Sequence, residues 1–387
     1  MVTKIGIASM FSGGGLADCG LKQLPGAELL WAVEYCPQIS EYYRANHGNH
    51  LITAKVEDVD YCKLERPTIL WASPECQQFS VANQNGIEGK EQVGQAEAIA
   101  CAIETLLPPV VLIENVRAYV GSRSWQLIVC TLEKFGYVYN PNQVFNSADY
   151  GVPQTRHRLV MRAIHRSVYT GFYQPDLFNP GSGTLAPLDY KERRIGWYEA
   201  VSDLIETATP TKLANWQIDF LSKRLAKNPI SLPALVRSSN SQQGRGKGYH
   251  AAKDPSMTVT ANNSLPKALL VQKCGARNGR VQVKGINDPC FTIRALAKDG
   301  HWEQANGLLV LDRPSSTSDT ISTVEELLSV SEVVLVPPRW LARFQTLPDS
   351  YRLPERSTLA TKIIGNGVPC RLAYQIASLT LAETYVL

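Results

Sequence analysis

One of the nine cysteines, Cys76, stands in a sequence setting that suits a nucleophile. The preceding stretch 68–72 is short, apolar and partly β-branched, which predicts a buried strand. Ser73 and Pro74 end that strand, because proline fixes its own φ and supplies no N–H group. Cys76 is therefore predicted just past the carboxyl end of a strand, where open parallel sheets bind ligands. Taken alone, this setting fits a buried structural cysteine equally well.

A carboxyl group is predicted at the same edge of the sheet. Residues 110–113 are all aliphatic and predict another buried strand, which is followed directly by Glu114. A nucleophile and a carboxyl group that converge at one sheet edge form an enzyme's arrangement rather than a binding module's. The polar, glycine-containing segment 77–95 is predicted to be a mobile loop attached to the thiol of Cys76.

A glycine-rich turn near the N-terminus predicts a nucleotide cradle. It runs from Phe11 through Ser12 to Gly15, between a predicted strand at 4–10 and a predicted helix at 16–23. In such a turn, backbone N–H groups approach a nucleotide closely. The glycine spacing does not meet the dinucleotide-binding fingerprint, so the turn alone is a weak indication.

Two acids are predicted to lie beside this cradle. Glu34 follows the second predicted strand, 29–33, and lies 21 positions after Gly13, which suits an acceptor for a ribose diol. Asp58 closes the third predicted strand, 51–56, and suits an acceptor for an adenine amino group. Without Glu34, a turn acid that caps the next element would explain Asp58 better.

The elements that must position these residues alternate between strands and helices. Beyond those already given, helices are predicted at 37–46, 93–107 and 124–135, and strands at 137–144 and 159–161. This alternation is typical of a doubly wound α/β sheet. Arg156 and Arg158 precede the last strand, and in an extended chain both would project to one face.

Length and composition indicate a globular protein of two domains. The 387 residues exceed what one compact core usually holds. The nine cysteines have no CxxC spacing, which favours reduced thiols in the cytosol over a disulfide scaffold or a zinc ribbon. The N-terminus lacks a signal-peptide pattern and the apolar runs are shorter than a membrane span, so no membrane association is expected.

Positive charge is concentrated in the second half of the chain. Residues 222–300 hold fourteen lysines and arginines against three aspartates, although the net charge of the whole chain is only +4. Such a segment predicts a polyanionic partner. The loop 242–250 within it carries Arg245 and Lys247, which suit contacts with phosphates. Helices are also predicted at 196–208, 216–225 and 372–386, and short strand units at 254–260 and 288–294.

Several short motifs occur in a fixed order, and together they resemble the DNA cytosine-5 methyltransferases, which use S-adenosylmethionine. The motifs are the turn 11–15, Glu34, Asp58, the stretch 74–80, Glu114-Asn115-Val116, Gln154-x-Arg156-x-Arg158, and the segments 338–351 and 364–369. The resemblance covers residues 1–163 and 336–387. It implies a Rossmann-like, doubly wound catalytic domain at 1–163, to which 336–387 returns. Residues 164–335 would then form a smaller, irregular, β-containing target-recognition domain.

The resemblance also implies roles for single residues. Cys76 would attack C6 of a flipped-out cytosine, Glu114 would act at N3, and Arg156 and Arg158 would hold the base. The implied cofactor site is Phe11, Ser12, Gly13, Gly15, Glu34, Asp58, Pro74 and Asn366, and the implied DNA contacts are Gln77, Ser80, Arg245 and Lys247. The expected partner is double-stranded DNA and the expected cofactor product is S-adenosylhomocysteine. We expect the protein to be a monomer that binds no metal. We also expect it to lie in the cytoplasm, associated with the nucleoid.

Departures from the family pattern keep other functions open. Leu16, Glu75 and Trp340 stand where the family usually has glycine, proline and glutamate. A carboxylate at Glu75 would disfavour the neighbouring thiolate, so we expect it to point away from the sulfur. The alternatives are an RNA cytosine-5 methyltransferase and a catalytically inactive nucleic-acid-binding relative. A zinc deaminase is disfavoured, because no second cysteine follows Cys290 at the required spacing.

Overall fold

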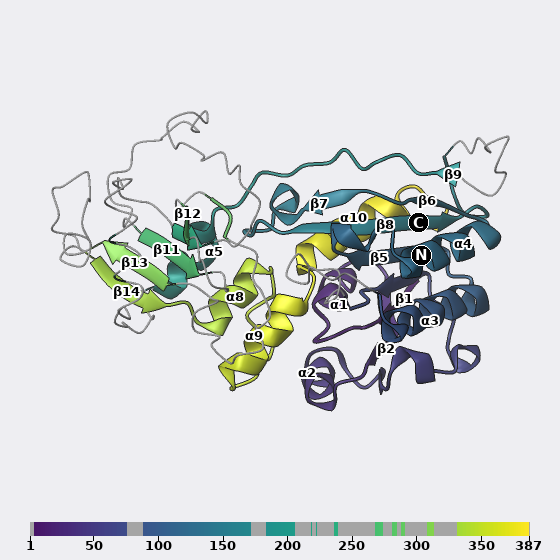
Figure 1. The fold of residues 1–387 in the computed structure, drawn as a ribbon, viewed down its shortest axis with the longest axis horizontal. Helices are drawn as coiled ribbons and strands as arrows, with labels where there is room; N and C mark the ends of the chain where they lie inside the picture. Colours follow the sequence, from purple (N-terminus) through teal and green to yellow (C-terminus); the bar gives the residue numbers. More distant parts are fainter. Residues whose placement is uncertain are drawn as a thin grey trace. The chain divides into compact units, whose positions relative to one another are not determined.

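The computed structural model describes residues 4–75, 88–171, 183–205, 218, 222, 236–238, 268–273, 281–284, 288–290, 308–312 and 331–386. The chain divides into two compact units. The first is formed mainly by residues 1–195 and 341–387, and the second mainly by 196–291 and 296–340. Each unit has a sheet of its own (Figure 1).

The first unit is built on a nine-stranded sheet with the order β3-β2-β1-β4-β5-β8-β6-β9, in which β7 also pairs with β8. The strands are β1 Ile5–Met10, β2 Ala27–Glu34, β3 Leu51–Thr53, β4 Ile69–Ala72, β5 Val110–Asn115, β6 Tyr137–Asn140, β7 Val144–Asn146, β8 His157–His165 and β9 Gly183–Thr184. Strands β1 to β5 are parallel, and β8 runs antiparallel to β5. Because β1 lies between β2 and β4, the strand order reverses there, and such switch points form ligand crevices at the carboxyl ends of strands.

Helices cover both faces of this sheet (Figure 1). The helices packed on it are α1 Leu16–Leu21, α2 Pro37–His47, α3 Lys90–Leu106, α4 Arg123–Lys134 and α10 Cys370–Leu381. The chain also forms α8 Pro338–Phe344 and α9 Ser357–Asn366 before α10. Ile99 of α3 and Ile128 of α4 share one apolar core with Met10. Ile376 of α10 shares the opposite core with Ile7. Alternate residues of each buried strand therefore serve the two cores, as the predicted doubly wound α/β fold requires.

Some element boundaries differ from those predicted. The strand predicted at 137–144 is two strands, β6 and β7, because Pro141 falls between them and cannot donate to a ladder. Helix α3 begins at Lys90, so the loop predicted at 77–95 ends earlier. Strand β3 ends at Thr53 rather than continuing to Val56, which begins a 3₁₀ turn.

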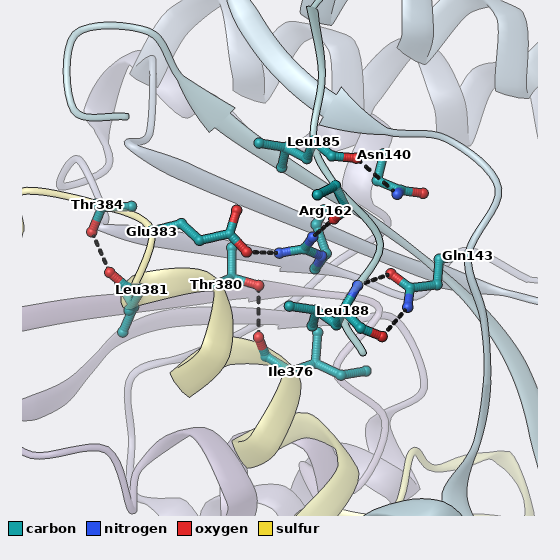
Figure 2. A network of polar contacts seen from close by, with 11 residues as sticks. Asn140, Gln143, Arg162, Leu185, Leu188, Ile376, Thr380, Leu381, Glu383 and Thr384 are labelled. Carbon is teal, nitrogen blue, oxygen red and sulfur yellow. Dashed lines mark hydrogen bonds and ion pairs between the residues drawn. The ribbon is translucent and has the colours of Figure 1, made fainter. Parts of the chain in front are cut away.

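A fully buried arginine joins the C-terminal segment to the sheet (Figure 2). Arg162 on β8 donates one hydrogen bond to Glu383 Oε1 at 2.8 Å and another to the carbonyl of Ala186 at 2.6 Å. Nearby, the side chain of Gln143 donates to the Leu188 carbonyl and accepts from the Leu188 N–H. Segment 183–188 and the end of the chain are thus held by partly buried polar contacts.

We expect Glu383→Leu to lower the free energy of unfolding by about 3 kcal/mol, because Arg162 would keep its buried charge without a counter-ion. This value lies at the low end of the usual range, since the Glu383 side chain is 28% exposed. Glu383→Gln is the matched control: it retains an acceptor and should cost less. Denaturant titration measures both, and equal stabilities of Glu383→Leu and the wild type would contradict this role of the pair.

The second unit contains a five-stranded sheet with the order β10-β12-β11-β13-β14. Its elements are α5 Trp197–Ile205, β10 Val236–Ser238, β11 Ala268–Lys273, β12 Val281–Lys284, β13 Leu308–Asp312 and β14 Ser331–Leu335. Neighbours in this order are antiparallel, and β10 also pairs with β11 in parallel. A smaller β-containing second domain was predicted and is present. The predicted unit 254–260 and most of the predicted helix 216–225 lie outside the described residues.

Candidate active site

The glycine turn between β1 and α1 has a backbone that few residues adopt. Phe11, Gly13 and Gly15 have φ angles of 58°, 55° and 78°. A non-glycine residue such as Phe11 in this region stores strain, which is common at binding sites. A Cβ on Gly14 would lie 2.4 Å from Ile363 Cγ2, so this glycine permits close packing. A Cβ on Gly13 would meet no described atom within 4 Å, so the turn faces open space there.

Glu34 anchors the turn to the end of β2. Its carboxylate accepts hydrogen bonds from the Gly13 N–H at 3.0 Å and from the Cys36 N–H at 2.8 Å. Ser12 also bonds to this strand end, because its N–H donates to the Val33 carbonyl at 2.9 Å. Burial raises the pKa of Glu34, and the two N–H groups oppose that effect. A buried carboxylate with free lone pairs therefore lies beside the turn, as the sequence predicted.

A second buried acid, Asp18, supports the turn from α1, and the sequence analysis assigned it no role. The Ser9 hydroxyl donates to its carboxylate at 2.7 Å. Burial raises the pKa of Asp18 to about 6, against hydrogen bonds from Ser9 and Tyr43 that lower it. The spacing of Ser9 and Asp18 across the turn carries no pattern that distinguishes such a support from an ordinary surface acid.

Asp58 lies beyond the strand that it was predicted to close. It ends the 3₁₀ turn Val56–Asp58, five residues after the end of β3, and it is exposed. The predicted strand was too long because β-branched residues continue to Val56. Instead, the Tyr61 hydroxyl donates to the Val56 carbonyl at 2.8 Å and holds the chain in the turn. The contact of Asp58 with an adenine amino group stays a prediction.

Two side-chain amides fix the backbone that leads into Cys76. The Asn115 amide, at the end of β5, donates to the Pro74 carbonyl at 3.1 Å. The Gln95 side-chain oxygen, on α3, accepts from the Glu75 N–H at 3.3 Å. Asn115 and Gln95 are both buried. The chain is thus held from both sides as it leaves β4, one residue before the candidate nucleophile.

Glu114 and Arg158 form the ion pair at the carboxyl edge. Arg158 Nε lies 2.9 Å from Glu114 Oε1, and the two side chains are 16% and 9% exposed. The pairing of β5 with β8, in which Glu114 lies opposite Val160, brings them together. The guanidinium therefore orients the carboxyl group at the end of the strand next to β4.

Arg156 has a different set of contacts from Arg158. Its guanidinium is buried and donates to the Gly365 carbonyl at 3.1 Å, near the end of α9. Gln154 donates to the Phe344 carbonyl at 3.3 Å. The motif 154–158 thus joins the C-terminal segment to the sheet through two of its members, and contacts Glu114 through the third.

The C-terminal segment completes the wall of the glycine turn. The Tyr351 hydroxyl donates to the Gly14 carbonyl at 2.5 Å. A Cβ on Gly367 would lie 2.4 Å from Leu16 Cδ2, which explains why glycine follows Asn366 and how Leu16 is accommodated. Asn366 is exposed at the end of α9. Trp340, another departure from the family pattern, is buried.

Several predicted site residues cannot be placed. Cys76, Gln77, Ser80, Arg245 and Lys247 lie outside the described residues. Within the described ranges, no group of three or more His, Cys, Asp or Glu side chains could hold a metal ion. The helices of the described part of the chain include none that is both long and apolar enough to cross a membrane.

Comparison with known proteins gives a family for the chain. Residues 5–381 match the model of the C-5 cytosine-specific DNA methylase family. Type II methyltransferase M.NgoFVII of Neisseria gonorrhoeae is 30% identical over 177 residues, which are 44% of this chain and 46% of that protein. Type II methyltransferase M.FnuDI of Fusobacterium nucleatum is 29% identical over 379 residues, which are 96% of this chain and 92% of that protein. A rat tRNA (cytosine(38)-C(5))-methyltransferase is 25% identical over 197 residues, which are 48% of this chain and 49% of that protein.

The chain matches only about half of the length of two of these relatives, 46% of M.NgoFVII and 50% of type II methyltransferase M.Bsp6I.

Among solved structures, S. pombe Dnmt2 has a TM-score of 0.58 and 14% identity, with 98% of both chains covered. Entamoeba histolytica EhMeth has a TM-score of 0.59 and 12% identity, again with 98% of both chains covered. At these identities the two structures show a shared fold. The family match over nearly the whole length is decisive: this chain belongs to the C-5 cytosine-specific DNA methylases.

Proposed function

We propose that this protein transfers a methyl group from S-adenosylmethionine to C5 of a flipped-out cytosine in double-stranded DNA, through a covalent bond between Cys76 and C6. The observation that carries the proposal is the Glu114–Arg158 pair at the end of β5, in which Glu114 is buried and Arg158 is partly exposed. It lies one strand away from the end of β4, and Asn115 and Gln95 fix the backbone that leads from β4 to Cys76.

This arrangement suits the chemistry of cytosine, whose C5 is a poor nucleophile. Attack by the Cys76 thiolate forms a bond to C6, while the Glu114 carboxyl group, in its protonated form, gives a proton or a hydrogen bond to N3 and so removes the charge that attack creates. Arg158 holds that carboxyl group in position. Once C5 carries the methyl group, the hydrogen originally bound to C5 leaves as a proton and is taken up by water. The electrons of the C5–H bond restore the C5–C6 double bond, and the Cys76 thiolate is expelled from C6. The base must leave the stack before any of these steps.

The residues of the glycine turn fit S-adenosylmethionine, which supplies an electrophilic methyl group on a sulfonium. Open space at Gly13 leaves room for a ligand against the backbone, and the buried Glu34 carboxylate retains lone pairs for a ribose diol. Phe11, Ser12, Gly15 and Pro74 flank these two groups in the proposed site. We include Asn366 and Asp58 at its margin, since both are exposed at the ends of their elements.

We expect Glu34→Ala to weaken S-adenosylmethionine binding about tenfold or more, because hydrogen bonds to a charged group contribute about 1.5–3 kcal/mol. Glu34→Gln should lose less, since its amide oxygen still accepts a hydrogen bond. Titration calorimetry measures the affinity, and the melting temperature shows whether the turn remains folded. Unchanged affinity in Glu34→Ala would mean that this carboxylate only anchors Gly13 and Cys36.

Double-stranded DNA is the proposed substrate because the basic segment 222–300 suits a polyanion and the family model that matches residues 5–381 is that of DNA methylases. In this proposal residues 164–335 recognise the target, with Arg245 and Lys247 against phosphates and Gln77 and Ser80 near the flipped base. The tRNA-modifying relative keeps RNA as the second candidate.

The test is transfer of a labelled methyl group to unmethylated plasmid DNA and, in parallel, to total tRNA. The proposal expects 5-methylcytosine in DNA and no transfer to tRNA. Transfer to tRNA alone would support the RNA enzyme. Absence of transfer to either substrate by a folded protein that binds S-adenosylmethionine would support a catalytically inactive relative.

A further inference from the structure

A carboxylate near the end of the first unit's main segment is held by four hydrogen bonds. Glu192 Oε2 accepts from Arg371 Nε at 2.9 Å and from Arg371 Nη2 at 2.7 Å. The other oxygen, Oε1, accepts from Gln375 Nε2 at 2.6 Å and from the Tyr190 hydroxyl at 2.9 Å. The Glu192 N–H also donates to the Asp149 carbonyl at 2.8 Å. The chain is thus fixed to the first unit shortly before it enters the second.

The backbone beneath this pair leaves room for it and for nothing else. Gly151 has a φ of 69°, and a Cβ there would lie 2.2 Å from Glu192 Oε2 and 2.5 Å from Arg371 Nε. A side chain at this position would therefore displace the pair. Arg371 lies in the first turn of α10, where the helix dipole disfavours a cation. The bond to Glu192, rather than the helix, explains an arginine at this position.

The segment by which the chain returns from the second unit is held by the same helix turn. The chain returns to the first unit for the last time at Leu341. Shortly after, Thr346 Oγ1 accepts a hydrogen bond from the Arg371 N–H at 2.9 Å. The Gln345 carbonyl accepts another from the Cys370 N–H at 3.0 Å. Arg371 therefore binds the outgoing segment with its side chain and the returning segment with its backbone.

We propose that Arg371 is a positioning residue for DNA recognition, which ties together the outgoing and the returning segment through Glu192 and Thr346. The inference rests on the function proposed above, in which target recognition belongs mainly to the second unit. Two domains move relative to each other by default when their connections are free. Ordering a free connection costs conformational entropy when DNA binds. Connections that are already fixed in the free protein avoid that cost, so the pair should favour DNA binding without contacting the cofactor.

The experiment measures steady-state methyl transfer by the full-length protein, with unmethylated plasmid DNA and S-adenosylmethionine as the varied substrates. In Arg371→Gln and in Glu192→Gln, we expect the KM for DNA to rise about tenfold, with the KM for S-adenosylmethionine unchanged. Arg371→Lys keeps a charged donor and should raise the KM for DNA less. Glu104→Gln is the matched control, because it removes the same charge from a surface pair with Lys134 and should change neither constant.

A direct contact between Arg371 and a DNA phosphate is the competing explanation, because this side chain is 46% exposed. Glu192→Gln separates the two, since loss of a negative charge would then leave the KM for DNA unchanged or lower it. If the two residues act as one anchor, Arg371→Gln should add little to the effect of Glu192→Gln. Hydrogen exchange of the free protein tests the anchor itself: the amides of 188–194 should exchange faster in both single variants.

An unchanged KM for DNA in Glu192→Gln would overturn the inference, and so would additive effects of the two substitutions. An equal rise of both KM values would also contradict it, because that pattern indicates a general loss of structure. If the wild type transferred no methyl group, the proposed function would fail before any variant is made, and the inference with it. If Arg371→Gln does not fold, as its melting temperature will show, Glu192→Gln and Arg371→Lys decide the question by the same criteria.

Discussion

Replacing Cys76 with serine is expected to reduce methyl transfer by about a thousandfold or more, because a hydroxyl is far less nucleophilic than a thiolate near neutral pH. Binding of S-adenosylmethionine should change little, since the groups proposed to hold it are untouched. The measurement is the single-turnover rate of labelled methyl transfer to DNA. Cys101→Ser is the matched control, because Cys101 is an exposed thiol on α3 and should be dispensable.

Full activity of Cys76→Ser would contradict the assignment of the nucleophile. An equal loss in Cys101→Ser would point instead to a general sensitivity of the fold to thiol replacement. The melting temperature of each variant is therefore measured first, and the methyl-transfer rates are compared only if both variants are as stable as the wild type.

Glu114→Gln is expected to slow the chemical step by about 10²–10⁴-fold, the usual contribution of a general acid, because an amide gives up a proton far less readily than a carboxyl group. Glutamine keeps the shape and still accepts from Arg158, so the fold should be preserved. Glu104→Gln is the matched control, since Glu104 is half exposed and pairs with Lys134 at the surface. An unchanged single-turnover rate would remove Glu114 from the mechanism.

The pair also predicts coupling between Glu114 and Arg158. If Arg158 acts by orienting the carboxyl group, Arg158→Met should lower the methyl-transfer rate strongly when it is introduced into the wild-type protein. Introduced into Glu114→Gln, it should lower that rate only slightly. Additive effects of the two substitutions would show that Arg158 acts on the base independently of Glu114.

The positions of Glu34 and Glu114 could be predicted because each depends on where a buried strand ends. Apolar runs define those ends, and the polar residue that follows is placed at the sheet edge by topology. The strand before Asp58 was predicted too long by the same reasoning, because an apolar run can end in a 3₁₀ turn when a nearby hydroxyl, here that of Tyr61, binds its backbone.

The contacts that position the site could not be predicted from local patterns. Asn115 binds a backbone carbonyl 41 positions away, and Gln95 binds an N–H group 20 positions away. Tyr351 reaches Gly14 across 337 positions. A single sequence encodes no periodicity for such pairs, since their partners are fixed by packing of whole elements. For the same reason, the alternation of Arg156 and Arg158 did not reveal that their side chains contact different partners.

The central claim is covalent attack by Cys76 on C6 of the target cytosine, and 5-fluorocytosine tests it most directly. Release of the enzyme requires loss of the group at C5, and fluorine cannot leave as a cation. Duplex DNA with 5-fluorocytosine at the target, incubated with S-adenosylmethionine, should therefore yield a denaturation-resistant adduct whose peptide maps to Cys76 by mass spectrometry. An adduct that maps to another cysteine, or one that persists in Cys76→Ser, would contradict the account.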